Sequence, residues 1–144
     1  MTHYNDRFGL DHITAWVQKT LNRDAIGFAE WFGRELAYDH FTNSQIRNIY
    51  GEVKRQQMSG YNEAKLLLLK PKLAYAAKRQ SGRNSEQAAE RLKTLLAGGI
   101  DAVVSSPDPA ASFENFADFF EAILAYHKAN EGKRRPGQFQ GRRR

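Results

Sequence analysis

Residues 112–129, with the sequence SFENFADFFEAILAYHKA, decide the fold because their apolar side chains recur every three or four positions. This spacing places the apolar side chains on one side of an α-helix. Phenylalanine dominates that side, which consists of Phe113, Phe116, Phe120, Ile123, Leu124 and His127. We expect this helix to make the largest aromatic contribution to the hydrophobic core.

The chain N-terminal to this segment shows the same helical pattern nearly throughout, without strand-like alternation of useful length. Helices are predicted over residues 11–21, 25–40, 42–58, 62–80, 85–97 and 112–129. The 144 residues suffice for one domain that buries a substantial core without metal ions or disulfides. We therefore predict an all-α fold, a single compact bundle of about five to six helices.

Proline and glycine residues mark expected interruptions of these helices. Pro71 lies inside the fourth helix and removes a backbone donor, so we expect a kink or two helices that meet near Lys70. Gly98 and Gly99 are expected to end the fifth helix, with residues 100–104 as a short helical continuation.

The composition excludes several classes of protein. The chain has no cysteine, which excludes disulfides, thiol nucleophiles and cysteine-based zinc sites. Its N-terminus is polar and lacks the apolar segment of a secretion signal. No stretch approaches the roughly 20 apolar residues that span a bilayer. We expect a cytoplasmic protein without a membrane partner.

Positive charge is concentrated in the middle of the chain. Residues 41–84 carry nine Lys or Arg residues against two acidic residues, a local charge of +7. Residues 1–40 sum to −2 and residues 85–129 to −4, while residues 130–144 return +5. A basic surface of this kind favours polyanions, most often nucleic acids, so the charge distribution predicts nucleic-acid binding.

The composition changes after residue 129 to NEGKRRPGQFQGRRR, which is rich in Gly, Gln and Arg. Such a segment buries too little apolar surface to offset the entropy of ordering it. We therefore predict a helical domain over residues 1–129 and a basic, flexible tail over residues 130–144.

The third predicted helix carries cations opposite its apolar side. Thr42 and Gln45 form a capping box that places its start. Arg47 and Lys54 lie seven residues apart and are almost eclipsed on the helix surface, and Arg55 adds a third cation. The apolar side consists of Ile46, Ile49, Tyr50 and Val53.

The fourth predicted helix carries a regular line of cations. Lys65, Lys72 and Arg79 recur every seven residues, about 10 Å apart along the helix axis. This line can follow a sugar-phosphate strand but cannot read bases, because cations aimed at phosphates fix position and not sequence. The cations that flank the line are Lys70, Lys78 and Arg83.

The sequence contains no recognisable catalytic or metal-binding motif. The histidines, which do not have the spacing of metal ligands, are His3, His12, His40 and His127. Asp118 and Glu121 share a helix face, but carboxylates so placed do acid–base chemistry only inside a pocket. We therefore predict no catalytic residue, no metal site and no cofactor.

Three sequence blocks point to a known family. They are TNSQIRN at residues 42–48, LKPKLAYAA at residues 69–77 followed by Arg79, and FADFFEAILAYHK from Phe116 onward. Through these blocks the sequence resembles the small subunit of type III-A CRISPR-Cas effector complexes, the Csm-type interference complexes. The first 40 residues match only loosely, and the basic tail extends beyond the usual end of the family.

The resemblance implies a noncatalytic, RNA-binding role in antiviral defence. Family members are small helical bundles that stack in several copies beside a filament of backbone subunits, where guide RNA (crRNA) pairs with target RNA. The implied partners are both RNAs, the backbone and large subunits, and further copies of the chain.

By motif, the phosphate contacts would be Arg47, Lys70, Lys72 and Arg79. Helix geometry adds Lys54, Arg55, Lys65, Lys78 and Arg83. The resemblance also implies that Tyr75 and Tyr126 pack.

The residues leave two alternatives open. The first is a stand-alone, nonspecific nucleic-acid-binding or scaffold protein anchored by the basic tail, whose cations would add salt-dependent affinity. The second is an enzyme that uses Asp118 and Glu121 as an acid pair. Loss of nearly all RNA binding on removal of residues 130–144 would favour the first alternative.

Overall fold

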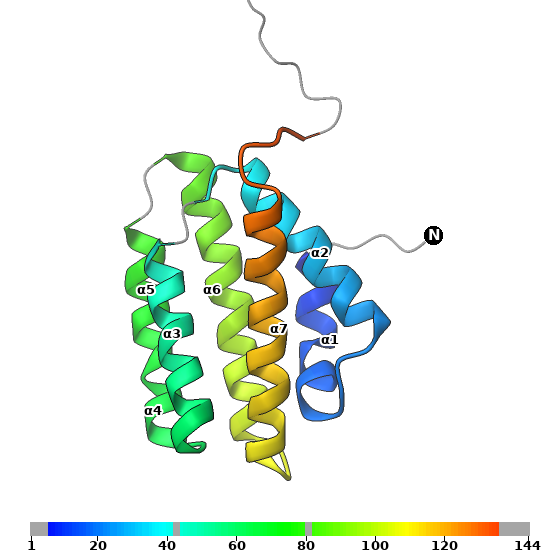
Figure 1. Cartoon of the computed structure of the whole chain (residues 1–144), viewed down its shortest axis with the longest axis vertical. Helices are drawn as coiled ribbons and strands as arrows, with labels where there is room; N and C mark the ends of the chain where they lie inside the picture. Colours follow the sequence, from blue (N-terminus) through cyan, green and yellow to red (C-terminus); the bar gives the residue numbers. More distant parts are fainter. Residues whose placement is uncertain (1–5, 42–43, 80–81, 136–144) are drawn as a thin grey trace, which may run out of the picture.

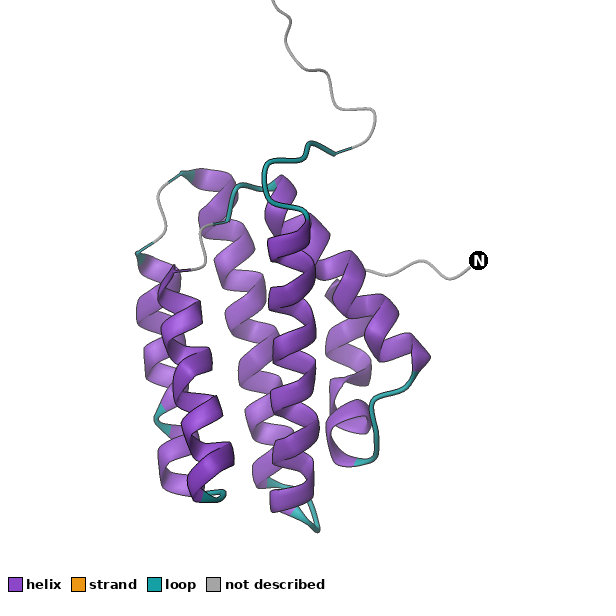
Figure 2. Ribbon diagram, in the orientation of Figure 1, coloured by secondary structure: helices purple, strands orange, loops and turns teal. Residues whose placement is uncertain are grey.

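A computed structural model describes residues 6–41, 44–79 and 82–135 of the chain (Figure 1). Seven α-helices and no strand occur in this part (Figure 2). The helices are α1 (Asp6–Gln18), α2 (Arg23–Tyr38), α3 (Ser44–Ser59), α4 (Glu63–Leu67), α5 (Leu69–Lys78), α6 (Arg83–Val104) and α7 (Pro109–Ala129). The predicted all-α bundle is confirmed.

Helices α6 and α7 form the centre of the bundle (Figure 1). On one side of this pair, α1 packs against both central helices and α2 packs mainly against α7. On the other side, α3 packs against α7, and α5 packs against α6. Because α3 and α5 also contact each other, the two basic helices lie side by side.

The core is built around the phenylalanines of α7. Those that are at most 1% exposed are Phe113, Phe116, Phe119 and Phe120. The ring of Phe119 lies 6.2 Å from that of Phe28 on α2 and 5.8 Å from that of Trp16 on α1. The predicted aromatic side of this helix is confirmed. It is wider than predicted because α7 is covered by α1, α2, α3 and α6, which buries Phe119 as well.

Gly33 on α2 allows a close approach to α7. A Cβ atom at this position would lie 2.7 Å from the carbonyl oxygen of Ile123 and 2.8 Å from the backbone nitrogen of His127. Both atoms belong to the α7 backbone, which cannot swing aside as the end of a flexible side chain can. Gly33 therefore sets the distance between α2 and α7, the helix pair with the most extensive contact in the described part.

The side chain of His127 on α7 binds the backbone just after the end of α2. Its side chain is fully buried, and Nε2 donates a hydrogen bond of 2.9 Å to the carbonyl oxygen of Phe41. The Phe41 ring packs edge-on against the imidazole, with 5.5 Å between the ring centres. Burial lowers the pKa of His127, and the hydrogen bond to Phe41 opposes this shift in part. The core therefore favours the neutral imidazole.

Helix α6 is longer than predicted. It continues to Val104 without a break at Gly98 and Gly99, so the prediction of an end there was wrong. A Cβ atom at Gly99 would lie 2.8 Å from the Phe116 ring, and one at Gly98 would lie 3.6 Å from Ile13. Gly99 brings α6 close to α7, whereas a Cβ atom at Gly98 would make only ordinary van der Waals contact with Ile13. This packing outweighs the cost of glycine inside a helix, about 1 kcal/mol per residue.

The predicted interruption near Lys70 is confirmed. Leu68 separates α4 from α5, and Pro71 is the third residue of α5. Amide groups in the first turn of a helix have no partner within the helix, so a proline costs little there. The proline therefore begins a new helix instead of kinking a long one.

Two other helices start earlier than predicted. Helix α6 begins at Arg83 instead of Ser85, and α7 begins at Pro109 instead of Ser112. The Asp108 carboxylate caps α7 by accepting a hydrogen bond of 3.3 Å from a backbone N–H of the first turn. A proline at the first helical position fits this cap because its ring already has the helical φ angle.

A larger difference concerns the N-terminal helix. Helix α1 begins at Asp6, five residues before the predicted start. The predicted capping box of Thr42 and Gln45 falls on side chains outside the described part of the structure.

The first part of the predicted tail folds back onto α2. Arg135 donates hydrogen bonds to the carboxylates of Glu35, at 2.7 Å, and Asp39, at 3.3 Å. Residues 130–135 are thus joined to the helical domain, while residues 136–144 lie outside the described part.

Gly33→Ala is expected to lower the free energy of unfolding by about 1–3 kcal/mol, because the new methyl group would collide with the α7 backbone. Gly51→Ala is the matched control, since the nearest atom to a Cβ there is the Arg55 Nη1, 3.7 Å away. The control should be neutral or stabilising. Urea unfolding measures both substitutions, and equal effects would contradict the close approach of α2 and α7.

The stability of the protein is expected to fall as the pH drops below about 6.5. Burial lowers the pKa of His127 below its value in the unfolded chain, so between the two pKa values the unfolded chain binds more protons. The contribution of His127 is complete above the unfolded pKa and is lost as the pH falls towards the folded pKa. Urea unfolding across this range should show a smaller pH dependence in His127→Gln. An unchanged pH dependence would assign the effect to other groups.

Candidate nucleic-acid interface

A groove lies on the surface between α3 on one side and α4 and α5 on the other. We call it the α3–α5 groove. Its charged, amide and aromatic lining includes Asn48, Glu52 and Arg55 on α3 and Lys65, Lys72 and Tyr75 on α4 and α5. Helix α3 buries its apolar side against α7, and α5 buries its apolar side against α6. The polar sides of α3 and α5 therefore meet at the surface.

Buried aliphatic residues fix the orientation of both helices. They are at most 5% exposed and comprise Ile46, Ile49 and Val53 on α3 and Leu69 and Leu73 on α5. Tyr50, on the same side of α3, is half-buried, with its ring 5.3 Å from that of Phe120 on α7. The predicted apolar side of α3 is confirmed, and it leaves Asn48, Glu52 and Arg55 facing the groove.

Three of the nine predicted RNA-binding residues line the groove, namely Arg55, Lys65 and Lys72, and a fourth, Arg79, donates a hydrogen bond to the groove residue Tyr75. Lys72 forms an ion pair with Glu52 that crosses the groove, and the two side chains are 48% and 32% exposed. A pair with this exposure contributes only about 0–1 kcal/mol to stability. A phosphate can therefore replace Glu52 as the partner of Lys72 at a small cost.

Three of the other predicted cations lie towards α6. Lys70 donates a hydrogen bond of 2.7 Å to Asp101. Lys78 lines a hollow between α5 and α6 beside Glu90. Arg83 is exposed at the first position of α6. The acidic neighbours of Lys70 and Lys78 weaken the attraction of this side for a polyanion.

The last two predicted cations, Arg47 and Lys54, lie on the α7 side of α3. Burial is the main cause that lowers the pKa of His127, and the nearby positive charge of Arg47 lowers it further. Although burial raises the pKa of the Asp118 carboxyl group by more, Lys54 is close enough for its positive charge to lower this pKa. The nine predicted cations therefore do not form one surface. Because successive residues of a helix point in different directions, these cations lie on three sides of α3 and α5.

A row of acidic residues on α7 borders α3 on this side. Glu114, Asp118 and Glu121 are exposed and lie on one face of the helix. Although Asp118 is exposed, partial desolvation by neighbouring atoms raises the pKa of its carboxyl group, and the charges of Glu121 and Glu114 raise it further. Burial, followed by the charge of Glu121, raises the pKa of Tyr50 to about 12. The α7 side is therefore negative and repels a polyanion, whereas the groove side is positive.

Tyr75 does not pack as expected, because it is 62% exposed at the edge of the groove. It lies three residues after Lys72 and four before Arg79, which places all three on one side of α5. The Arg79 Nη1 donates a hydrogen bond of 2.7 Å to the Tyr75 hydroxyl, and the guanidinium lies 5.6 Å from the ring centre. Tyr126 is half-buried and packs against the core, as predicted.

Besides Tyr75, the groove residues Asn48 and Glu52 were not among the predicted site residues. They lie four residues apart and therefore on the same side of α3. The sequence contains this spacing, but it does not show which neighbouring helix that side faces.

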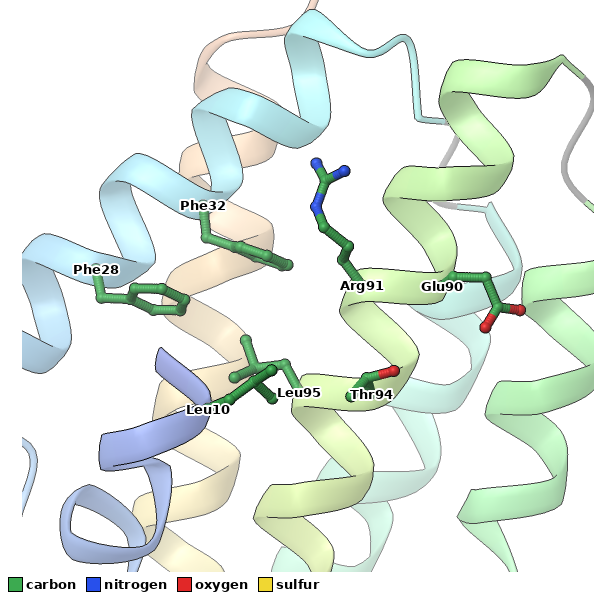
Figure 3. Close-up of a pocket in the computed structure, with 7 residues that line it drawn as sticks. All are labelled: Leu10, Phe28, Phe32, Glu90, Arg91, Thr94 and Leu95. Carbon is green, nitrogen blue, oxygen red and sulfur yellow. The ribbon is translucent and has the colours of Figure 1, made fainter. Parts of the chain in front are cut away.

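An apolar pocket lies between α1, α2 and α6 (Figure 3). Its walls are formed mainly by Leu10, Phe28, Phe32 and Leu95. Arg91 stands at its rim, where it donates a hydrogen bond of 3.1 Å to Asp39. The cavity volume of about 200 Å³ is below the roughly 300–1,000 Å³ of typical ligand sites. This pocket is therefore a poor candidate for a substrate site.

The acid pair considered for an enzyme has no pocket of this kind. Asp118 and Glu121 are exposed on α7 and line neither the apolar pocket nor the α3–α5 groove. Within the described residues, no group of three or more His, Asp or Glu side chains could hold a metal ion. The groove is thus the site that the geometry favours.

A model of the Csm2 Type III-A family matches residues 19–133. The chain belongs to this family. It is a small subunit of type III-A CRISPR-Cas complexes, which confirms the resemblance seen in the sequence. No curated protein and no solved structure gives a significant match.

The family match spans α2 to α7 and therefore includes the whole α3–α5 groove. Helix α1 precedes the matched segment, yet Trp16 and Val17 are at most 3% exposed in the core. This Csm2 family member thus completes its core with a helix that lies outside the matched segment. In the part of the chain that the structure describes, no helix is both long and apolar enough to cross a membrane.

Proposed function

We propose that the α3–α5 groove contacts phosphates of the duplex formed by target RNA and guide RNA (crRNA), without reading its sequence. The observation that supports this role is that Arg55, Lys65 and Lys72 line one groove while acidic residues of α7 border the opposite side of α3. Lys and Arg side chains aimed at phosphates fix position and carry no sequence information. Base pairing between the RNAs would supply specificity, as in other RNA-guided effectors.

In this proposal the subunit acts in several copies, stacked beside a filament of backbone subunits and next to the large subunit. Each copy offers only a few cations, so an isolated copy should bind RNA weakly and lose affinity steeply with salt. Assembly into one complex would raise the effective concentration of each contact. The cations outside the groove would add a weaker, long-range attraction; they are Arg47, Lys54, Lys70, Lys78 and Arg83. The role is architectural, and no residue of the chain is assigned to catalysis.

Replacing Arg55, Lys65 and Lys72 together by Glu is expected to weaken binding to a labelled RNA duplex by at least about tenfold at low salt. The slope of log affinity against log salt should flatten by about 0.7–0.9 for each phosphate that the variant no longer neutralises. Fluorescence anisotropy at several salt concentrations measures both quantities.

The matched control is the triple replacement of Lys70, Lys78 and Arg83 by Glu. It changes the net charge by the same amount on the side that faces α6. Circular dichroism confirms that both variants are folded. An equal drop in RNA affinity in the two variants would show that net charge alone drives binding, and this would contradict a role for the groove.

Glu52→Gln is expected to tighten RNA binding severalfold at low salt, because it removes a negative charge from the groove and releases Lys72 for a phosphate. The gain should vanish at about 1 M salt, where charges are screened within roughly 3 Å. Glu63→Gln makes the same charge change on α4 and should have a smaller effect. Weaker binding by Glu52→Gln would argue against phosphate contact at Lys72.

The alternative of a stand-alone binder anchored by the tail is tested by removing residues 136–144, which contain three of the tail's arginines. Arg135 and its contacts with α2 remain in this variant. Loss of nearly all RNA binding would favour the tail as the anchor. Retained binding, together with its loss in the triple groove variant, would favour the groove.

A further inference from the structure

We propose that Tyr75 and Arg79 form a stacking platform for one unpaired RNA base, held in the α3–α5 groove beside Asn48. This inference rests on the proposed function and adds a contact of another chemical class. The cations would hold phosphates, whereas the platform would hold a base that is not in the duplex.

The exposure of Tyr75 is the first observation that supports a platform. The residue is 62% exposed on a helix whose other side is in the core, so its ring is open to a ligand. Its hydroxyl group already accepts a hydrogen bond of 2.7 Å from Arg79. This hydrogen bond favours one ring orientation before a ligand arrives, which lowers the entropy cost of binding in part.

The surroundings of Tyr75 fit a planar, partly polar ligand. The hollow that it lines is walled by Ile49, Pro71 and Ala76, which offer apolar contact to the flat face of a base. Asn48 lines the same hollow, and its amide has both a donor and an acceptor, as the edge of any base requires. Lys72 is also part of the lining and is placed to hold the phosphate of the same nucleotide.

An aromatic ring in a basic groove has a known physical role in single-strand binding. Stacking of a base on an aromatic side chain is tolerant of sequence, because every base has a π-face. The Arg79 guanidinium lies 5.6 Å from the Tyr75 ring centre, next to where a base would stack, so it would add a cation–π contact to that base. A base inside a duplex is stacked on its neighbours and cannot reach such a ring. The ligand must therefore be an unpaired nucleotide.

The test uses the full chain and three RNA duplexes of equal length. One duplex is perfectly paired, one has a single unpaired nucleotide in one strand, and one has an abasic residue at that position. The last two carry the same phosphates, so their difference in affinity isolates the base. The variants are Tyr75→Phe, which keeps the ring, and Tyr75→Leu, which keeps an apolar side chain without a π-face.

We expect the protein to prefer the unpaired base over the abasic residue by at least about fivefold, from the strength of base–aromatic stacking. Tyr75→Phe should retain most of this preference, and Tyr75→Leu should lose it while binding the paired duplex unchanged.

No preference in the natural chain, or an equal preference in Tyr75→Leu, would overturn the platform. A result of that kind would leave the groove proposal intact, because the triple groove variant tests the phosphates separately. If Tyr75→Leu instead abolishes capture of the backbone or large subunit and leaves RNA binding unchanged, Tyr75 belongs to a protein interface and the platform is wrong.

Discussion

The close packing of α7 against α2 is the constraint on which the rest of the structure depends. Gly33 lets the two backbones approach so closely that a Cβ atom there would lie 2.7 Å from the Ile123 carbonyl oxygen. This contact places the phenylalanines of α7 in the core, and it brings His127 to the carbonyl group of Phe41. That hydrogen bond fixes where the chain leaves α2, just before the undescribed link to α3.

The electrostatic character of the surface follows from this arrangement. Helix α3 packs on α7, so its α7 side meets a row of acids at Glu114, Asp118 and Glu121, whereas its other side meets the basic helix α5. A polyanion is therefore repelled on one side of α3 and attracted on the other. Glu52 also lines the groove and forms an ion pair with Lys72. Its negative charge weakens the attraction of the groove for a polyanion but does not reverse it, because Arg55 and Lys65 line the groove as well.

Much of the fold can be predicted from the sequence because helices depend on local spacing. The Phe side of α7 and the break before Pro71 are examples. Gly98 and Gly99 show the limit: glycine favours a helix end locally, but here α6 continues through both glycines, and Gly99 makes room for the Phe116 ring of α7. The site is limited in the same way. Spacing identifies lines of cations on each helix, but only packing decides which lines face each other and leaves Tyr75 exposed.

The most direct test of the groove as the RNA-binding surface is photo-crosslinking in the assembled complex. A tagged chain is purified with its partners from cells that encode it, irradiated with ultraviolet light, and digested for mass spectrometry. The account predicts guide RNA and Csm-type backbone and large subunits in the preparation, with RNA crosslinks concentrated on α3, α4 and α5. Crosslinks concentrated on α7 or on α1 and α2, with none in the groove, would contradict it.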